Sequence, residues 1–171
     1  GVIPALSMNQ ELDALSWAQD KMLSAGIVQV QDAWIERGMA EVYLEAHARG
    51  LLKVRTNLAF RVTPENFEDD FSYFEDLRHQ IDALDSKLLT AKTAKFFADG
   101  VLGSGTAAVV EPYEDSHHHG EPVWEKQRLL EVTKRYAAAG YQLHIHAIGD
   151  AAVRDALDAI EQAPKTILPG V

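Results

Sequence analysis

The sequence predicts an α/β fold in which parallel strands alternate with helices. Helical periodicities and short apolar runs follow one another along the 171 residues, and a glycine follows three of the predicted helices, at positions 26, 50 and 140. Strands separated by helices of this length pair in parallel, because a parallel connection needs a long crossover. A first helix and four strand–helix units are compatible with a small open sheet or with part of a barrel, since a complete eightfold barrel needs about 250 residues.

The first part of the chain is expected to form a helix followed by two strand–helix units. The patterns predict a helix over 10–24, a strand over 27–33, a helix over 38–49 and a strand over 53–60. Thr63 and Pro64 form a typical helix start, with a capping hydroxyl followed by proline at the first helical position. An acidic, aromatic helix is therefore expected from Thr63 to Leu84.

The second part of the chain is expected to carry two further strands around a long loop. The patterns predict a strand over 93–98, a Gly-rich loop over 99–123, a helix over 125–139, a strand over 141–147 and a helix over 150–162. In the last helix, we expect the face with Val153, Ala156, Leu157 and Ile160 to point inward. A chain of this length typically forms one domain, so residues 1–171 are expected to be a single domain.

Composition excludes several classes of function. The formal net charge is −10 and no cluster of Lys and Arg is present, which argues against nucleic acid as a partner. The absence of cysteine excludes disulfides and thiolate metal sites. Residues 1–10 do not resemble a signal peptide and no apolar run is long enough to span a membrane, so we expect a cytoplasmic protein with no membrane partner.

Two histidines lie near the carboxyl end of the predicted strand over 141–147. His144 and His146 are two residues apart and therefore share a face of the strand. His146 is nearer the carboxyl end, where α/β folds bind their ligands. A metal site and a pair of core histidines are both compatible with this spacing. Asp150, which follows Gly149, is expected to cap the next helix.

A lysine and an aspartate mark the end of the predicted strand over 93–98. Lys95 lies in an apolar run, and because burying an ammonium group is costly, we expect it either to pair with a carboxylate or to carry a modified amine. Asp99 forms a turn with Gly100, or faces the active site. Asp32, at the end of the strand over 27–33, is expected to be a helix cap or a site residue.

A run of three histidines lies in the loop over 99–123. His117, His118 and His119 are surrounded by turn-forming residues, and three consecutive histidines cannot readily face one metal. A solvated loop is the expected role, with a contribution to a lid over the site as the alternative.

These motifs, in this order, resemble a known family. The run from Lys95 to Ala108, the residues Glu111 to Tyr113, and the segment from His146 to Asp150 are similar to amidohydrolase family 3, a branch of the metal-dependent amidohydrolase superfamily that includes enzymes like N-substituted formamide deformylase. The segment 25–33 also resembles the second barrel strand of that family. The family commonly has arginine where Gly105 stands.

The resemblance implies a partial TIM (β/α)8 barrel with about four parallel strand–helix units, units two to five of the whole. It also implies a divalent metal, usually zinc, in the parent enzyme. Lys95, often carbamylated in the family so that it bridges two metals, and His146 match metal ligands. His144, Asp99 and Asp150 are then left to a second layer or to substrate contacts. Further family ligands, on strands one, six and eight, have no match in this sequence.

The resemblance further implies hydrolysis of a small-molecule substrate by a metal-activated water, at an amide or other carbon–nitrogen bond that is not a peptide bond. With at most two ligands, the chain alone is expected to be inactive and to hold no tightly bound metal. The alternative is a non-catalytic half-barrel domain used for association or regulation. A partial barrel also exposes two strand edges, which predicts self-association.

Overall fold

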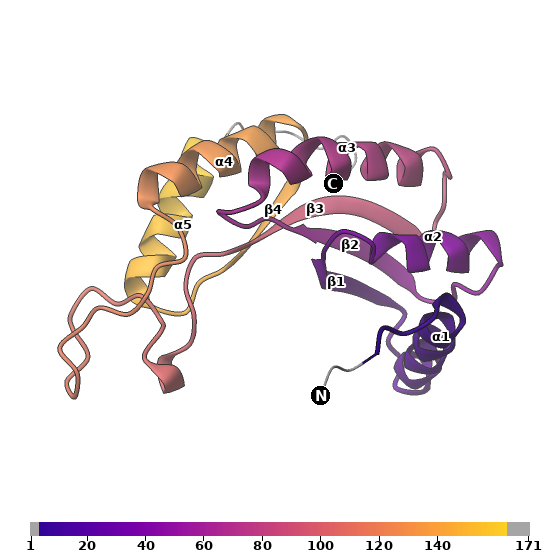
Figure 1. The fold of residues 1–171 in the computed structure, drawn as a ribbon, viewed down its shortest axis with the longest axis horizontal. Helices are drawn as coiled ribbons and strands as arrows, with labels where there is room; N and C mark the ends of the chain where they lie inside the picture. Colours follow the sequence, from indigo (N-terminus) through magenta and orange to yellow (C-terminus); the bar gives the residue numbers. More distant parts are fainter. Residues whose placement is uncertain (1–3, 164–171) are drawn as a thin grey trace. The chain divides into compact units, whose positions relative to one another are not determined.

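A computed structural model describes residues 4–163, and in it helices alternate with strands (Figure 1). The elements are α1 (Met8–Ser24), β1 (Gln29–Ile35), α2 (Ala40–Ala48), β2 (Arg55–Arg61), α3 (Phe67–Asp82), β3 (Leu89–Phe97), the 3-10 helix η1 (Leu102–Ser104), α4 (Lys126–Ala138), β4 (Gln142–His146) and α5 (Asp150–Gln162). The α/β class with four strand–helix units is therefore confirmed, and the arrangement is that expected of a segment of a (β/α)8 barrel.

The strands are hydrogen-bonded in the order β1-β2-β3-β4, and the pairing is parallel. In the first pair, Gln29 lies opposite Arg55 and the register shifts between Asp32 and Ile35. In the last pair, the register runs without a shift from Thr93 opposite Gln142 to Phe97 opposite His146. Neighbouring parallel strands in sequence order are what successive strand–helix units produce.

The described chain forms two compact units: residues 4–60 with 73–91, and residues 61–72 with 92–163. The prediction of a single domain stays a prediction. In the first unit, Phe60 of β2 stacks on Phe74 of α3 with ring centroids 4.5 Å apart. Gln19 of α1 is buried, and its Oε1 accepts from the backbone N–H groups of Lys53 and Val54. These contacts attach α1 and α3 to the chain around β2.

The core of the second unit forms around an aromatic cluster between β3 and α4. Phe96 is fully buried and its ring lies 5.8 Å from that of Tyr136 and 5.9 Å from that of Trp124. Phe71, at the start of α3, meets Tyr136 edge-on at 5.0 Å. The face of β3 that carries Phe96 therefore packs against α4. Lys95 and Phe97 lie on the opposite face of the strand, because successive residues of a strand alternate between its two faces.

The inward face of α5 differs from the prediction. Its buried residues are Ala152, Ala156 and Ala159, whereas three larger side chains are exposed: Val153 (40%), Leu157 (61%) and Ile160 (48%). Ala152 packs in a cluster with Ala98 and Ala108, together with partly buried Ile145, Ala147 and Ala151. The Ala152 N–H donates to the Ala108 carbonyl at 3.3 Å, so the start of α5 lies close to the backbone of the loop after β3.

Element boundaries differ from the prediction in two instructive places. Helix α3 begins at Phe67 and not at Thr63, because the backbone N–H groups of Asn66 and Phe67 both donate to the Thr63 carbonyl and close a turn first. Strand β3 begins at Leu89 and not at residue 93. Polar Thr90 and Lys92 alternate there with buried Leu89 and Ala91, a period-two pattern that continues the strand. None of the helices described is both long and apolar enough to cross a membrane.

Candidate functional site

Three of the residues predicted for the site lie together on one face of the second unit. Lys95 of β3 is the register partner of His144 of β4, and Phe97 is the partner of His146. Residues two apart on a strand share a face, and register partners on parallel neighbours share it too. Lys95, His144 and His146 therefore project from the same side of β3 and β4, and His146 and Phe97 are the last residues of their strands.

Lys95 is a buried amine without a carboxylate partner among residues 4–163. The residue is 5% exposed, and its Nζ lies 4.4 Å from the centroid of the Phe97 ring. Burial lowers the pKa of Lys95 below its ordinary value. Of the two roles expected for this lysine, an ion pair is therefore not formed within the described chain, and the neutral fraction of the amine is higher than that of an exposed lysine at the same pH.

The imidazole of His146 is oriented by a backbone carbonyl. Its Nε2 lies 2.9 Å from the carbonyl oxygen of Gly100, and its ring lies 5.0 Å from the ring of Phe97. A carbonyl only accepts hydrogen bonds, so this contact assigns the proton to Nε2 and leaves the lone pair on Nδ1. The ring is partly exposed, with 24% of its side-chain surface accessible. His146 therefore offers one nitrogen as a ligand atom.

His144 lies beside Lys95 and is affected by it. Burial and the positive charge of Lys95 both lower the pKa of His144 below its ordinary value. The imidazole is thus neutral near pH 7, which avoids two adjacent cations on this face. The deeper layer that the resemblance implies for His144 stays a prediction.

Asp99, directly after β3, is surrounded by backbone N–H groups. It is 1% exposed; its Oδ2 accepts from Ala108 N at 2.9 Å and Gly149 N at 2.8 Å, and its Oδ1 accepts from Ile148 N at 3.0 Å. His146 Nε2 lies 3.8 Å from Oδ1. The sequence predicts that Asp99 forms a turn or faces the active site. It does not predict that the Asp99 carboxylate joins three backbone segments through these hydrogen bonds.

Asp150 does not cap α5 in the predicted way. The N-cap residue is Gly149, and Asp150 is the first residue of the helix. Its Oδ1 accepts from Ala151 N at 3.0 Å and from Val110 N at 2.9 Å. The cap prediction was wrong because the chain needs a residue without a Cβ at the capping position, where the Ala108 carbonyl approaches Gly149. Asp150 joins the loop to the helix instead.

Asp32 belongs to the first unit, and it is not the N-cap residue of α2. The N-cap residue of α2 is Met39. The Asp32 carboxylate accepts from the Tyr43 hydroxyl at 2.7 Å and from Trp34 N at 3.3 Å. Burial, together with this hydrogen bond and the charge of Asp32, raises the pKa of Tyr43. Asp32, in the middle of β1, thus attaches this strand to α2.

The histidine run stabilises the loop that carries it. His118 Nδ1 accepts from Gly120 N at 3.0 Å, and its ring lies 5.2 Å from that of Tyr113. His119 Nδ1 lies 3.3 Å from the carbonyl oxygen of Val109. These contacts are local to the loop, and the expectation that the three histidines do not face one metal stays a prediction.

The residues present fit part of a metal centre but not a whole one. Within residues 4–163, no group of three or more His, Asp and Glu side chains is arranged to hold a metal ion. Lys95 and His146 supply two candidate ligands on adjacent strands, whereas protein zinc sites have three or four protein ligands. Any step that runs through a metal therefore needs donors beyond this set.

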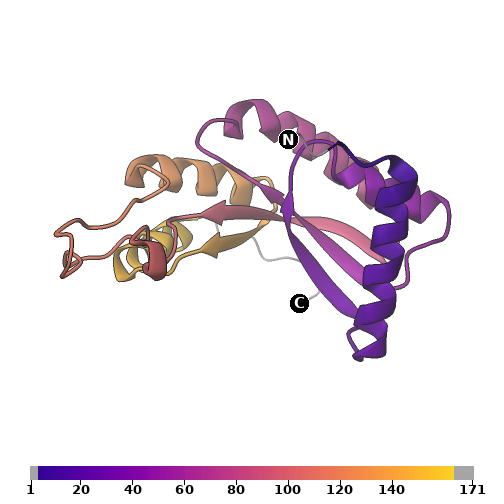
Figure 2. The same ribbon diagram turned by 60° about the horizontal axis from the view of Figure 1, so that its bottom comes forward.

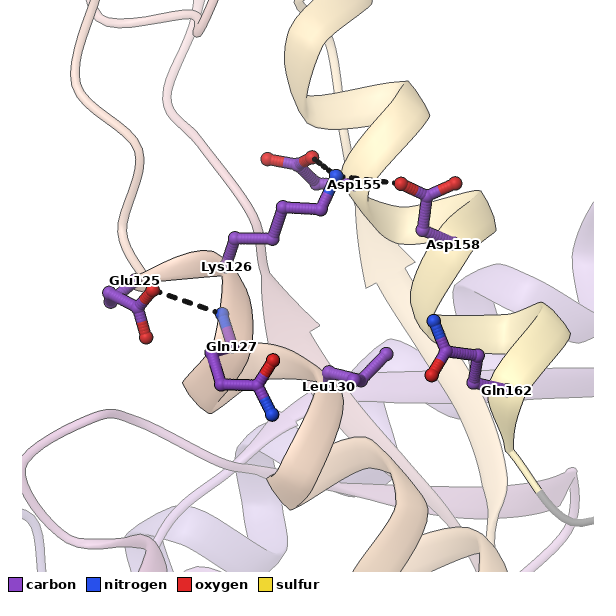
Figure 3. A pocket seen from close by; sticks show the side chains of 7 residues that line it. All are labelled: Glu125, Lys126, Gln127, Leu130, Asp155, Asp158 and Gln162. Carbon is purple, nitrogen blue, oxygen red and sulfur yellow. Dashed lines mark hydrogen bonds and ion pairs between the residues drawn. The ribbon is translucent and has the colours of Figure 1, made fainter.

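A separate surface pocket of about 300 Å³ lies between α4 and α5. Figure 3 shows Lys126 reaching from α4 toward Asp155 and Asp158 of α5, at 2.8 and 2.7 Å. The hydrogen bond to Asp155 and the smaller effect of the one to Asp158 raise the pKa of Lys126 above its ordinary value. None of the residues lining this pocket is among those predicted for the site.

We expect Lys126→Ala to leave the denaturation midpoint of the chain nearly unchanged, because exposed ion pairs contribute little in water. Urea denaturation at low and at high salt measures this. A large loss of stability would contradict it and would show that the pocket depends on Lys126.

Three comparisons with known proteins agree with one another. A family model described as the amidohydrolase family matches residues 1–168. The chain is 30% identical to the protein LONG AFTER FAR-RED 3 of Arabidopsis thaliana over 93% of this chain and 28% of that protein. It is 34% identical to "Putative amidohydrolase YtcJ" of Bacillus subtilis over 52% of this chain and 17% of that protein.

Among solved structures, the chain is similar to an uncharacterized metal-dependent hydrolase from Pyrococcus furiosus. The TM-score is 0.70 and the sequence identity 28%, over 92% of this chain and 32% of that one. The chain therefore spans about a third or less of the length of these relatives.

Proposed function

Because the chain belongs to the amidohydrolase family, we propose that β3 and β4 carry two ligands of a metal-dependent hydrolase, Lys95 and His146. The observation that carries this proposal is the register of the two strands. It places a buried amine without a carboxylate partner and a histidine with a free Nδ1 lone pair on one face, at the carboxyl end of parallel strands. Enzymes with this fold build their active sites at that end.

The proposed chemistry of Lys95 is carbamylation. A neutral lysine amine attacks carbon dioxide through its nitrogen lone pair; a C–N bond forms, one proton leaves, and the product is an anionic carbamate whose oxygens can bind metal. Burial lowers the pKa of Lys95 and so raises the fraction of neutral amine available for this step. The neutral state of His144 keeps a second positive charge away from the same amine.

We propose that the reaction is hydrolysis of an amide or other non-peptide carbon–nitrogen bond in a small molecule. Lys95 and His146 would hold part of the coordination of a divalent metal, zinc in our proposal, which would supply an activated water and polarise the bond to be broken. In this chain, His146 would bind through Nδ1, since Gly100 holds its Nε2. Family membership and the metal-dependent hydrolase relative support this proposal.

The reading frame on either side of this chain tests the proposed function. An upstream His-x-His pair, a downstream histidine and a downstream aspartate, each after a predicted strand, are the donors that the described residues lack. If they are present, the product of the whole frame should bind metal and hydrolyse N-acyl or N-formyl amines. If they are absent, the non-catalytic alternative, a half-barrel domain used for association or regulation, replaces the enzyme.

A zinc titration of the 171-residue chain is a second test. With two candidate ligands, we expect the chain alone to bind zinc with a Kd weaker than about 1 μM, since tight sites use three or four ligands. Isothermal titration calorimetry against His146→Gln, with Lys126→Ala as a surface control, separates the site from adventitious binding. Stoichiometric binding at sub-micromolar Kd would contradict an incomplete site.

We further propose that the chain associates with itself. Within the described sheet, β1 and β4 each pair with a single strand, and the unpaired edges of such strands attract other chains. The exposed apolar side chains of α5 add to this tendency. Light scattering coupled to gel filtration should show a mass that rises with concentration. A monodisperse monomer across the concentration range would exclude this proposal.

A further inference from the structure

The buried carboxylate of Asp99 is not used by the proposed chemistry, although it lies next to the site. No part of its side chain is exposed to solvent. A buried carboxylate is costly unless hydrogen bonds compensate for the lost hydration, and here three backbone N–H groups do so at 2.8 to 3.0 Å. All three donors are neutral backbone groups, and the His146 Nε2 lies farther away, 3.8 Å from Oδ1.

The three donors come from two segments that are far apart in the sequence. Ala108 lies in the loop after β3, whereas Ile148 and Gly149 form the turn between β4 and α5. The same turn is held from the other side, because the Ala108 carbonyl accepts from Ala152 N and lies against Gly149, where a Cβ would overlap it. Asp99 thus joins the loop, the turn and the end of β3 at a single point.

The residues joined at Asp99 are close to His146 in the sequence and to the residue that contacts its ring. Ile148 is two residues after His146, and Gly100 directly follows Asp99. The Gly100 carbonyl is the group that accepts from His146 Nε2, and the Ala98 N–H donates to the His146 carbonyl. The backbone on both sides of Asp99 is therefore bonded to His146. Any displacement of Asp99 moves the carbonyl that selects the protonated nitrogen of the imidazole.

We propose that Asp99 is a positioning residue that acts through the Gly100 carbonyl to hold the His146 imidazole in the Nε2–H tautomer, with the Nδ1 lone pair free. The proposal rests on the proposed function only in that Nδ1 is the intended ligand atom. The tautomer itself is a property of this chain, and it can be measured without metal, substrate or activity.

The wild-type chain provides the first test by NMR. Long-range ¹⁵N–¹H spectra of the histidine rings, recorded about two pH units above the ordinary histidine pKa, report the tautomer of each ring. The His146 signal is identified by its absence in His146→Gln. We expect a single Nε2–H form, together with hydrogen-bond couplings from the amides of Ala108, Ile148 and Gly149 to the Asp99 carboxyl carbon. Tautomer averaging at His146, or missing couplings, would overturn the proposal.

The variant Asp99→Asn provides the second test. An asparagine side chain has one acceptor oxygen and one donor nitrogen, so whichever way it is oriented, at least one of the three N–H groups faces another donor. We expect at least about tenfold faster hydrogen exchange at one or more of these amides, and a His146 ring that averages between its two tautomers. Asp158→Asn, which removes an exposed carboxylate paired with Lys126, is the matched control and should change neither signal.

The outcomes separate positioning from a merely structural role. If exchange accelerates at these amides while His146 keeps its single tautomer, Asp99 stabilises the fold but does not position the ring, and the proposal is wrong. If neither changes, it is equally wrong. Should Asp99→Asn fail to fold by circular dichroism, the wild-type couplings and tautomer still decide. A chain that passes these tests but lies in a frame without further metal donors would refute the proposed function and leave the positioning intact.

Discussion

Replacing Gly149 with alanine is expected to destabilise the chain by about 3 kcal/mol or more, at the upper end of the range for overpacked positions. Its φ of −72° is open to any residue, so the reason is not backbone conformation. A Cβ at this position would overlap the Ala108 carbonyl oxygen, and backbone atoms cannot move aside as a flexible side chain can. The displaced segment would also pull Ala108 N and Gly149 N away from Asp99 and leave a buried carboxylate with fewer partners.

Chemical denaturation of wild-type and variant chains measures this loss, with equal slopes as evidence that both unfold from a comparable native state. Gly103→Ala is the matched control, because a Cβ there meets nothing within 4 Å. If Gly149→Ala unfolds at the same denaturant concentration as Gly103→Ala, then the close approach of Ala108 is not a constraint on the fold.

The order of elements could be predicted from the sequence because apolar periodicity and helix-ending glycines are local signals. Helix α5 has the predicted bounds, 150–162, and β4 lies within its predicted range. Which face of α5 points inward could not be predicted in this way. Periodicity alone ranks Leu157 above Ala156, although the structure buries the alanine and exposes the leucine.

The site was predictable in part for a similar reason. Lys95 and His146 belong to consecutive strands, and consecutive parallel strands in such a fold are neighbours, so their adjacency follows from the order of motifs. The role of Asp99 was not predictable, because its partners are backbone N–H groups 9, 49 and 50 residues away. Backbone donors exist at almost every residue and leave no mark on the sequence. The glycine at 149 was the available signal, and its cause is a close approach that only the structure shows.

Replacing Lys95 with methionine is expected to stabilise the chain near neutral pH by on the order of 1 kcal/mol, as removal of a buried, unpaired charge generally does. Methionine keeps the length of the side chain and its contact with the Phe97 ring, and it removes the ammonium group. A residue whose removal stabilises the fold is retained for another reason. The proposed role as a metal-binding carbamate supplies that reason, since function commonly opposes stability at active sites.

The gain should depend on pH in a defined direction. Burial lowers the pKa of Lys95 in the folded chain below 10.5, the ordinary value that describes the unfolded chain. Below the folded pKa both states are protonated, and the wild type carries the full cost of the buried charge. As the pH rises from there toward 10.5, the folded state loses its proton first, the unfolded state binds more protons, and wild-type stability rises. The advantage of Lys95→Met should therefore shrink with rising pH and vanish near 10.5.

Denaturation midpoints across this pH range, in buffer free of carbon dioxide, measure the difference between the two chains. Lys92→Met, at an exposed position of the same strand, controls for the loss of one positive charge. If Lys95→Met is less stable than the wild type at neutral pH, the ammonium is held by a favourable partner and is not an available amine.

With ¹³C-bicarbonate, the wild type should show a carbamate carbon signal that Lys95→Met lacks. In the product of the whole reading frame the same substitution should lower hydrolysis by at least about a hundredfold, since even the partners that orient metal ligands contribute tenfold to a hundredfold. Greater stability combined with lost carbamate and lost activity would identify Lys95 as a residue retained for chemistry at the expense of the fold.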